Sequence, residues 1–313
     1  MDGYIVLGSA IIGLLVGLTG AGGGALMTPM LILLFSVKPT AAISSDLVAA
    51  LVMRPVGAAV HFQRGTVNLR LVGWLALGSV PAAFTGTYLL HRLSDGPAAA
   101  ANVEKALGAA LLLGAAAMVL RAILDRRAGQ TREGLVHDVS ARPLRTIAIG
   151  VVGGIVVGMT SVGAGSLMIV LLMFAYPTLS AGRLVGTDLM QAIPLTAAAA
   201  LGALAFGHVD IPITSSIVVG SVPAVLVGSL LSSRVPDRHL RPVIGVVILA
   251  SGLKYVGLTT DELAVSVAAV VAILAGRAII NARRQRVQDD PAIPSEFAAD
   301  QPAREGTIAP AAR

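Results

Sequence analysis

Three charged residues stand inside apolar stretches of this sequence, where a charge is costly and usually functional. Asp46 and Asp188 lie near the starts of two such stretches, 142 positions apart, and Arg54 lies near the middle of the first. Burying an Arg costs at least about 2.5–3.5 kcal/mol on insertion scales, so Arg54 needs a partner. That partner is either an anionic substrate or, in a structural ion pair, Asp46 or Asp188.

The two matched aspartates are candidates for carrying a proton. Desolvation disfavours an ionised carboxylate, which suits a carboxyl group in an apolar setting to proton uptake and release. Each of the two follows a Ser or Thr. Because Asp at a helix start satisfies free backbone N–H groups, this setting favours helix capping as the role of Asp46 and Asp188. Gln191 is a further hydrogen-bond donor candidate nearby.

Two glycine-rich blocks, GLTGAGGGALM at 17–27 and GMTSVGAGSLM at 158–168, resemble each other. A glycine-broken helix would aim the N-terminus of its second half, and the positive end of its dipole, at an anion. We therefore predict an anion site formed by Thr19, Gly20, Gly22, Gly23, Gly24, Thr160, Ser161, Gly163, Gly165 and Ser166, together with Arg54 and Gln191. The alternative is that the glycines only allow close helix packing.

Composition excludes most other chemistry. The chain of 313 residues is 55% hydrophobic and 13% charged, with a mean hydropathy of +0.83, which argues against a soluble enzyme or a disordered protein. Its net charge of +6 comes from basic residues in short gaps between apolar runs, so no nucleic-acid partner is expected. There is no Cys, the His residues lack ligand spacing, and hydrolase and nucleotide motifs are absent. We predict a non-enzyme without metal or cofactor.

The elements that must position these residues are apolar segments typical of an all-α polytopic membrane protein. They cover about 4–36, 43–62, 70–90, 102–123, 145–176, 183–206, 212–231, 240–257 and 262–281. Most have the roughly 20 residues that a bilayer crossing needs. The segments 4–36 and 145–176 are too long for one crossing and carry the glycine blocks, so each is predicted to be two half-length helices.

The distribution of Lys and Arg supports these breaks. If both long segments enter and return on one side, sixteen of the counted Lys and Arg residues fall on one face of the membrane and four on the other. Single crossings would divide them almost evenly. We therefore expect the N-terminus outside and the C-terminus in the cytoplasm, although a re-entrant hairpin and two short crossings remain equally compatible with the count.

The chain also repeats itself. The glycine blocks are offset by 141 residues, and three more blocks by 142: Ser45-Asp46-Leu47 with Thr187-Asp188-Leu189, the Gly65 to Asn68 block with the Gly207 to Asp210 block, and Gly78 to Pro81 with Gly220 to Pro223. An odd number of crossings per copy predicts two inverted-topology repeats. The predicted divisions are repeat 1 (1–123), a cytoplasmic linker (124–144), inverted repeat 2 (145–257), an extra helix (258–284) and a disordered cytoplasmic tail (285–313).

The stretches GLTGAGGGALMTPML, ISSDLVAALVMRPVGAAVHFQRGTVN and GMTSVGAGSLM followed by VGTDLMQAIP resemble the TauE/SafE family of membrane permeases. The resemblance covers about residues 5–257. It implies a secondary carrier that exports a small sulfur-containing anion, such as sulfite or an organosulfonate, across the inner membrane. An anion channel on the same scaffold and a non-transporting membrane scaffold remain the alternatives.

Overall fold

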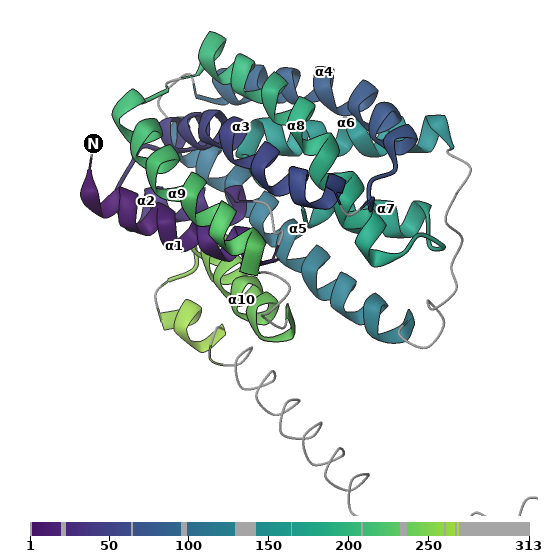
Figure 1. Cartoon of the computed structure of the whole chain (residues 1–313). Helices are drawn as coiled ribbons and strands as arrows, with labels where there is room; N and C mark the ends of the chain where they lie inside the picture. The colour runs from purple at the N-terminus through teal and green to yellow at the C-terminus, as the bar shows by residue number, and fades with distance from the viewer. Residues whose placement is uncertain are drawn as a thin grey trace, which may run out of the picture. The chain divides into compact units, whose positions relative to one another are not determined.

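The computed structural model describes residues 2–19, 23–63, 65–94, 99–128, 142–163, 165–207, 209–231, 237–259, 261–266 and 268. Across these residues the chain is helical, as predicted, and Figure 1 labels the helices. They are α1 (Gly3–Thr19), α2 (Gly24–Leu33), α3 (Pro39–Gln63), α4 (Leu69–Leu93), α5 (Ala99–Ala128), α6 (Pro143–Thr160), α7 (Leu167–Ala175), α8 (Ala181–Phe206), α9 (Ile211–Leu231) and α10 (Asp237–Val256).

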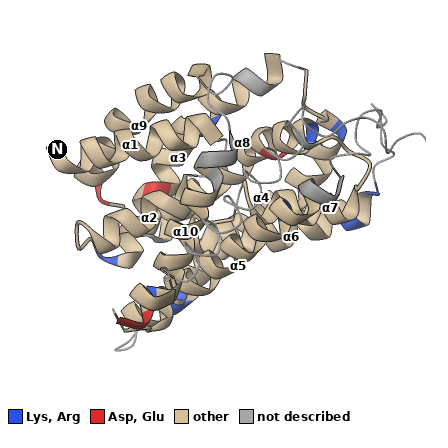
Figure 2. Ribbon diagram, turned by 90° about the horizontal axis from the view of Figure 1, so that it is seen from below, with Lys and Arg blue, Asp and Glu red and all other residues tan. Residues whose placement is uncertain are grey.

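Six helices in the described residues are long and apolar enough to cross a membrane: α3, α4, α5, α6, α8 and α9. α1, α2 and the apolar part of α10 are apolar but shorter. Figure 2 shows that the helices are tan over most of their length, with few charged positions between their ends. A bilayer core of about 30 Å is spanned by about 20 helical residues, so the chain is a multi-pass membrane protein.

Both predicted helix breaks are present. The segment 4–36 forms α1 and α2, and the segment 145–176 forms α6 and α7. The second member of each pair is short, with 10 residues in α2 and 9 in α7. At 1.5 Å per residue each rises about 15 Å, which is half the thickness of a hydrocarbon core.

The helices of the two repeats correspond one to one, with α1–α5 matching α6–α10. The most extensive helix contacts are those of α4 with α6 and of α1 with α9, and these two pairs are equivalent under that correspondence. The α3–α8 and α5–α10 pairs join corresponding helices directly. The packing is therefore consistent with the duplication, while the opposite orientation of the two copies in a bilayer stays a prediction.

Glycines explain why the two strongest helix pairs are so close. A Cβ on Gly78 of α4 would overlap the backbone of Ile147 in α6, and a Cβ on Gly220 of α9 would overlap the backbone of Val6 in α1. Small residues let helix backbones approach in this way within a bilayer. The fourth repeated block of the sequence, which contains Gly78 and Gly220, thus has a packing role.

Two clusters of buried apolar side chains form the interior of this part of the chain. One surrounds α2, with contributions from α1, α3, α5, α9 and α10, and the other surrounds α7, with contributions from α3, α4 and α8. α2 is buried over Gly24–Leu31 without interruption. Each half-helix therefore lies among other helices, and α3 reaches into both clusters.

The predicted divisions of the chain stay a prediction. The chain separates into one compact unit, Met1–Val267, that holds both repeats, and a second, Ala268–Arg313. α5 continues to Ala128, and α6 begins at Pro143, so helices occupy both ends of the predicted linker. The rest of the linker, 129–141, lies outside the described residues, as do most of the extra helix and the whole tail.

Candidate functional site

The second helix break shows why glycine is needed there. α6 ends at Thr160, and the next residue, Ser161, has a left-handed backbone with φ 59°. Gly163 and Gly165 follow with φ 115° and 93°. Only glycine adopts such angles without strain, so these residues turn the chain from α6 into α7. In the first break, Gly23 precedes α2, whereas Gly20 and Gly22 lie outside the described residues.

The two breaks are in contact with each other. Gly24, the first residue of α2, is so close to Ser161 that an added Cβ would overlap the Ser161 carbonyl group. On the other side of this break, the Ser166 hydroxyl lies 3.4 Å from the place of a Cβ on Gly114 of α5. Residues of the two glycine blocks, 137 positions apart in the sequence, thus lie against each other.

The two half-helices begin without side-chain caps. Gly23, before α2, has no side chain that could cap the helix. The Ser166 side chain, before α7, accepts no hydrogen bond from its helix. The first N–H groups of an α-helix have no partner within that helix. At the second break, the Gly165 N–H donates a hydrogen bond to the Asp188 carboxylate.

Asp46 lies at the first break and is fully buried. The Thr28 hydroxyl of α2 donates to Asp46 Oδ2 at 2.9 Å. Ser161, which is also buried, interacts with the same carboxyl group from the second break. Asp46 Oδ1 and Ser161 Oγ have no hydrogen bond of normal geometry within the described part of the chain. Asp46 therefore joins α2, α3 and the end of α6.

Asp188 lies at the second break and is 1% exposed. Gln191 Nε2 donates to Asp188 Oδ1 at 3.4 Å, and Gln191 Oε1 accepts from the Ser79 hydroxyl of α4 at 3.1 Å. With the Gly165 N–H, these contacts link Asp188 to α4 and to the start of α7. Gln191 thus orients the acid that holds the second break.

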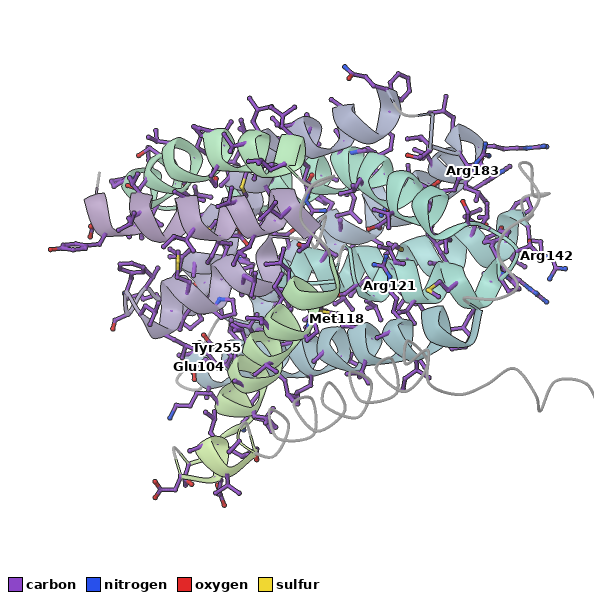
Figure 3. The ribbon with its side chains drawn as sticks, turned by 60° about the horizontal axis from the view of Figure 1, so that its bottom comes forward. Glu104, Met118, Arg121, Arg142, Arg183 and Tyr255 are labelled. Carbon is purple, nitrogen blue, oxygen red and sulfur yellow. The ribbon has the colours of Figure 1, made fainter. Side chains whose placement is uncertain are left out.

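Arg54 of α3 acts electrostatically on both acids, with the interaction with Asp188 the stronger. Among the described residues no carboxylate lies within ion-pair distance of the Arg54 guanidinium. A second cation, Arg121 of α5, also acts on Asp188. In the view of Figure 3 the Arg121 side chain lies over the middle of the helices, whereas Arg142 and Arg183 lie near the edge.

The predicted capping role of the aspartates is also wrong. α3 begins at Pro39 and α8 at Ala181, so Asp46 and Asp188 lie about two turns inside their helices. Neither helix has an acidic residue in its first turn. The aspartates instead bind partners on other elements, which is what a site between helices requires.

The remaining predicted hydroxyl donors are used within helices. Thr19 Oγ1 donates to the Leu15 carbonyl at 2.7 Å, and Thr160 Oγ1 donates to the Val156 carbonyl at 2.6 Å. Such back-bonding occupies the single hydrogen of each hydroxyl. Thr19 and Thr160 therefore stand beside the breaks without a donor directed at a ligand in this structure.

The doubled Ser/Thr-Asp blocks form a matched pair of hydrogen bonds. The Asp210 N–H donates to Ser45 Oγ at 3.2 Å, and the Asn68 N–H donates to Thr187 Oγ1 at 3.1 Å. Each N–H belongs to the residue that caps the following helix: Asn68 caps α4, and Asp210 accepts from Ile213 in α9. Two of the repeated sequence blocks thus bind each other across the two copies.

The described residues contain no cluster of metal-ligating side chains. In the described residues no three His, Cys, Asp or Glu side chains come close enough to hold a metal ion. The residues brought together are two acids, two arginines, an amide and several hydroxyls. Their chemistry is that of charge compensation and hydrogen bonding to an anion or a proton.

Comparison with known proteins agrees with this architecture. Residues 5–255 match the family described as sulfite exporter TauE/SafE. A "Probable membrane transporter protein YjnA" of Bacillus subtilis is 40% identical over 260 residues, covering 82% of this chain and all of the relative. "Probable membrane transporter protein YdhB" of the same organism is 24% identical over 257 residues, covering 80% and 98%. A "Probable membrane transporter protein" of Xylella fastidiosa is 28% identical over 253 residues, covering 79% and 92%. No solved structure is significantly similar.

Proposed function

The chain belongs to the TauE/SafE sulfite exporter family, and on that premise we propose that it exports a small sulfur-containing anion. The protein is a membrane transporter, and the proposal adds its substrate class: sulfite or an organosulfonate. It also places the chain in the inner membrane, with the N-terminus outside and the C-terminus in the cytoplasm. Asp46 and Asp188 are the proposed groups for coupling to protons.

One observation carries the proposal: the two helix breaks meet beside the buried charges. Gly24 and Ser161 are in contact, Ser161 interacts with Asp46, and Arg54 acts on both acids. Uncapped helix starts and an arginine attract a negative group. Intramembrane charges of this kind line substrate pathways in membrane proteins. A sulfonate or sulfite would find hydrogen-bond donors and positive charge together here.

Burial of the site favours a carrier over a channel. Asp46, Gln191 and Thr28 are 0% exposed, and Ser161 is 1% exposed. A solvated pore would expose the groups that line it, whereas a carrier passes through a state closed to both sides. We propose that the structure is such a closed state and that the two inverted repeats move against each other to open the site.

Counterflow in proteoliposomes tests this function. Vesicles preloaded with unlabelled sulfite and diluted into labelled sulfite should accumulate label transiently, with saturable rates, only when the protein is present. Methanesulfonate on the inside should stimulate the same uptake if organosulfonates share the site. A conductance without exchange would support the channel instead. Absence of both exchange and conductance, for sulfite and for methanesulfonate, would contradict the proposed substrate class.

A further inference from the structure

Two hydrogen bonds between the repeats lie at opposite ends of the α3–α8 pair. The Asp210 N–H, which follows the C-terminal end of α8, donates to Ser45 Oγ near the N-terminal end of α3. The Asn68 N–H, which follows the C-terminal end of α3, donates to Thr187 Oγ1 near the N-terminal end of α8. The two packed helices therefore run in opposite directions, with one of these bonds at each end.

The distance between the two bonds is close to the thickness of a membrane. From Ser45 to the end of α3 at Gln63 the helix rises about 27 Å, at 1.5 Å per residue. From Thr187 to the end of α8 at Phe206 the rise is about 28 Å. The hydrocarbon core of a bilayer is about 30 Å thick. Each bond therefore lies toward a different surface of the membrane when the two helices cross it.

Both accepting hydroxyls are sealed from solvent beside the buried acids. Ser45 and Thr187 are each 0% exposed, and Asp46 and Asp188 follow them directly in the chain. The loop that donates each bond belongs to the other repeat. These two loops thus contribute to the cover of the site at its two ends.

The two loops also pack closely against the helices that they cover. A Cβ on Gly186 of α8 would overlap the backbone of Thr66, and a Cβ on Gly207 would overlap the Ser44 hydroxyl of α3. Ser44 and Gly186 are equivalent positions of the two repeats, 142 residues apart. The same part of each repeat therefore packs against a loop of the other repeat.

We propose that these two bonds are the gates of the transport cycle and that they open in alternation. This rests on the proposed function, because a carrier opens its site to one side of the membrane at a time. With the proposed orientation, the Ser45–Asp210 bond is the outer gate and the Thr187–Asn68 bond is the inner gate. Both bonds are formed in this structure, which is the closed state. Motion of one repeat against the other breaks one bond and leaves the other as the seal.

A single hydrogen bond to a neutral hydroxyl suits a gate. When the bond breaks, water replaces the lost partner of each group, so the net cost of opening is small. The α4–α6 and α1–α9 pairs differ, because their helix backbones lie against each other at several glycines. Opening at the two gates therefore loses less packing than separation of those helix pairs does.

Reversible cross-linking tests both gates, because the chain contains no Cys that would interfere. The outer pair is Ser45→Cys with Asp210→Cys, and the inner pair is Asn68→Cys with Thr187→Cys. Each pair is joined in proteoliposomes by a short reagent with two methanethiosulfonate groups, and counterflow of labelled methanesulfonate is measured before and after reduction. Methanesulfonate is the substrate because sulfite itself cleaves disulfides. We expect that joining either pair stops counterflow and that reduction restores it.

Thr259→Cys with Glu262→Cys is the control pair, because these two residues share one exposed turn. Joining them should leave counterflow unchanged. Full counterflow with either gate joined would overturn the inference and leave the proposed function standing. Absence of methanesulfonate counterflow in the wild type would contradict the organosulfonate part of the proposed function, and the gates are then decided by a measurement that needs no substrate.

That measurement is the reaction of single variants with a membrane-impermeant thiol reagent. We expect Ser45→Cys to react from outside, in intact cells, and Thr187→Cys to react from the cytoplasmic side, in inside-out vesicles. Both positions are buried in the closed state, so the reaction requires that the gate opens. Reaction of both variants from the same side, or of neither from either side, would refute the alternation. The two single replacements are close in size to the natural side chains, so they also decide the question if a double variant does not fold.

Discussion

Gly24 at the start of α2 lies directly against the backbone of Ser161 at the end of α6, so the two helix breaks touch. Gly24→Ala would force this contact apart, because the new Cβ meets carbonyl atoms that cannot turn away. Overpacking of this kind costs about 1–3 kcal/mol. We expect a lower thermal unfolding temperature in detergent and slower sulfite counterflow.

Gly23→Ala is the control for that substitution. Gly23 has helical backbone angles, and the nearest atoms to its added Cβ, in Met53 and Val16, are 3.8 Å away. The change is within ordinary van der Waals contact, so the unfolding temperature should stay near the wild-type value. Equal losses in the two variants would mean that glycine at this break serves flexibility and not the contact with Ser161.

A second pair of glycines tests the close helix packing. Gly78 of α4 approaches the backbone of α6, whereas Gly73 of the same helix has no atom near the position of its Cβ. Gly78→Ala should destabilise the protein by about 1–3 kcal/mol. Gly73→Ala should be neutral or stabilising by up to about 1 kcal/mol, since Ala is the better helix former. Thermal unfolding of both variants in one detergent measures the difference, and the reverse order would contradict the packing role.

The hydroxyl groups of Ser45 and Thr187 are expected to matter equally, because each accepts one hydrogen bond from the N–H of a capping residue in the other repeat. Removing an acceptor leaves a partly or fully buried N–H unpaired, at about 1–3 kcal/mol. Ser45→Ala and Thr187→Val should therefore lower the unfolding temperature by similar amounts. Ser215→Ala is the control, because its hydroxyl bonds the Pro212 carbonyl in an exposed turn of α9. If only one of the two substitutions lowered the unfolding temperature strongly, the two hydrogen bonds would not contribute equally to stability.

Much of this architecture could be predicted because most of its features occur in both repeats of the sequence. Both breaks, the corresponding helices and the Ser/Thr-Asp blocks follow from segment length and a nearly constant offset. The duplication aligns Gly24 with Gly165, so it does not identify the contact of Gly24 with Ser161. Where the two copies differ, the duplication gives no information. Thr28, which binds Asp46, corresponds to Ile169 in the second glycine segment, so the repeat does not identify Thr28 as a site residue.

The errors have a common physical origin in helix ends. The first turns of α3 and α8 are less apolar than the rest, so the predicted segments began near 43 and 183 and the aspartates fell at their starts. The helices begin earlier, and capping by these aspartates is ruled out. α5 likewise extends to Ala128, beyond the predicted end at 123. Hydropathy locates the apolar middle of a helix better than its polar ends.

Thr28→Val should destabilise the protein at the first helix break. The substitution keeps the shape of the side chain and removes the hydroxyl that donates to Asp46 Oδ2. A hydrogen bond to a charged group contributes about 1.5–3 kcal/mol, so the unfolding temperature should fall clearly. Thr85→Val is the control, because this exposed hydroxyl bonds only the Pro81 carbonyl of its own helix, as far as the described contacts go. Similar decreases in unfolding temperature in the two variants would mean that the Thr28–Asp46 hydrogen bond contributes no more to stability than the exposed Thr85 hydrogen bond.

Arg54 and Arg121 should both be needed for anion affinity, although only Arg54 stands out in the sequence. Each acts electrostatically on Asp188, so its loss removes positive charge that would attract an anion. Arg54→Gln and Arg121→Gln should each weaken methanesulfonate binding at least about tenfold, which is about 1.4 kcal/mol. Arg142→Gln, at an exposed side chain near the edge of the helices, should bind as the wild type does. Calorimetric titration of the three variants checks this order. A loss of affinity confined to Arg54→Gln would mean that Arg121 acts on Asp188 without contributing to anion binding.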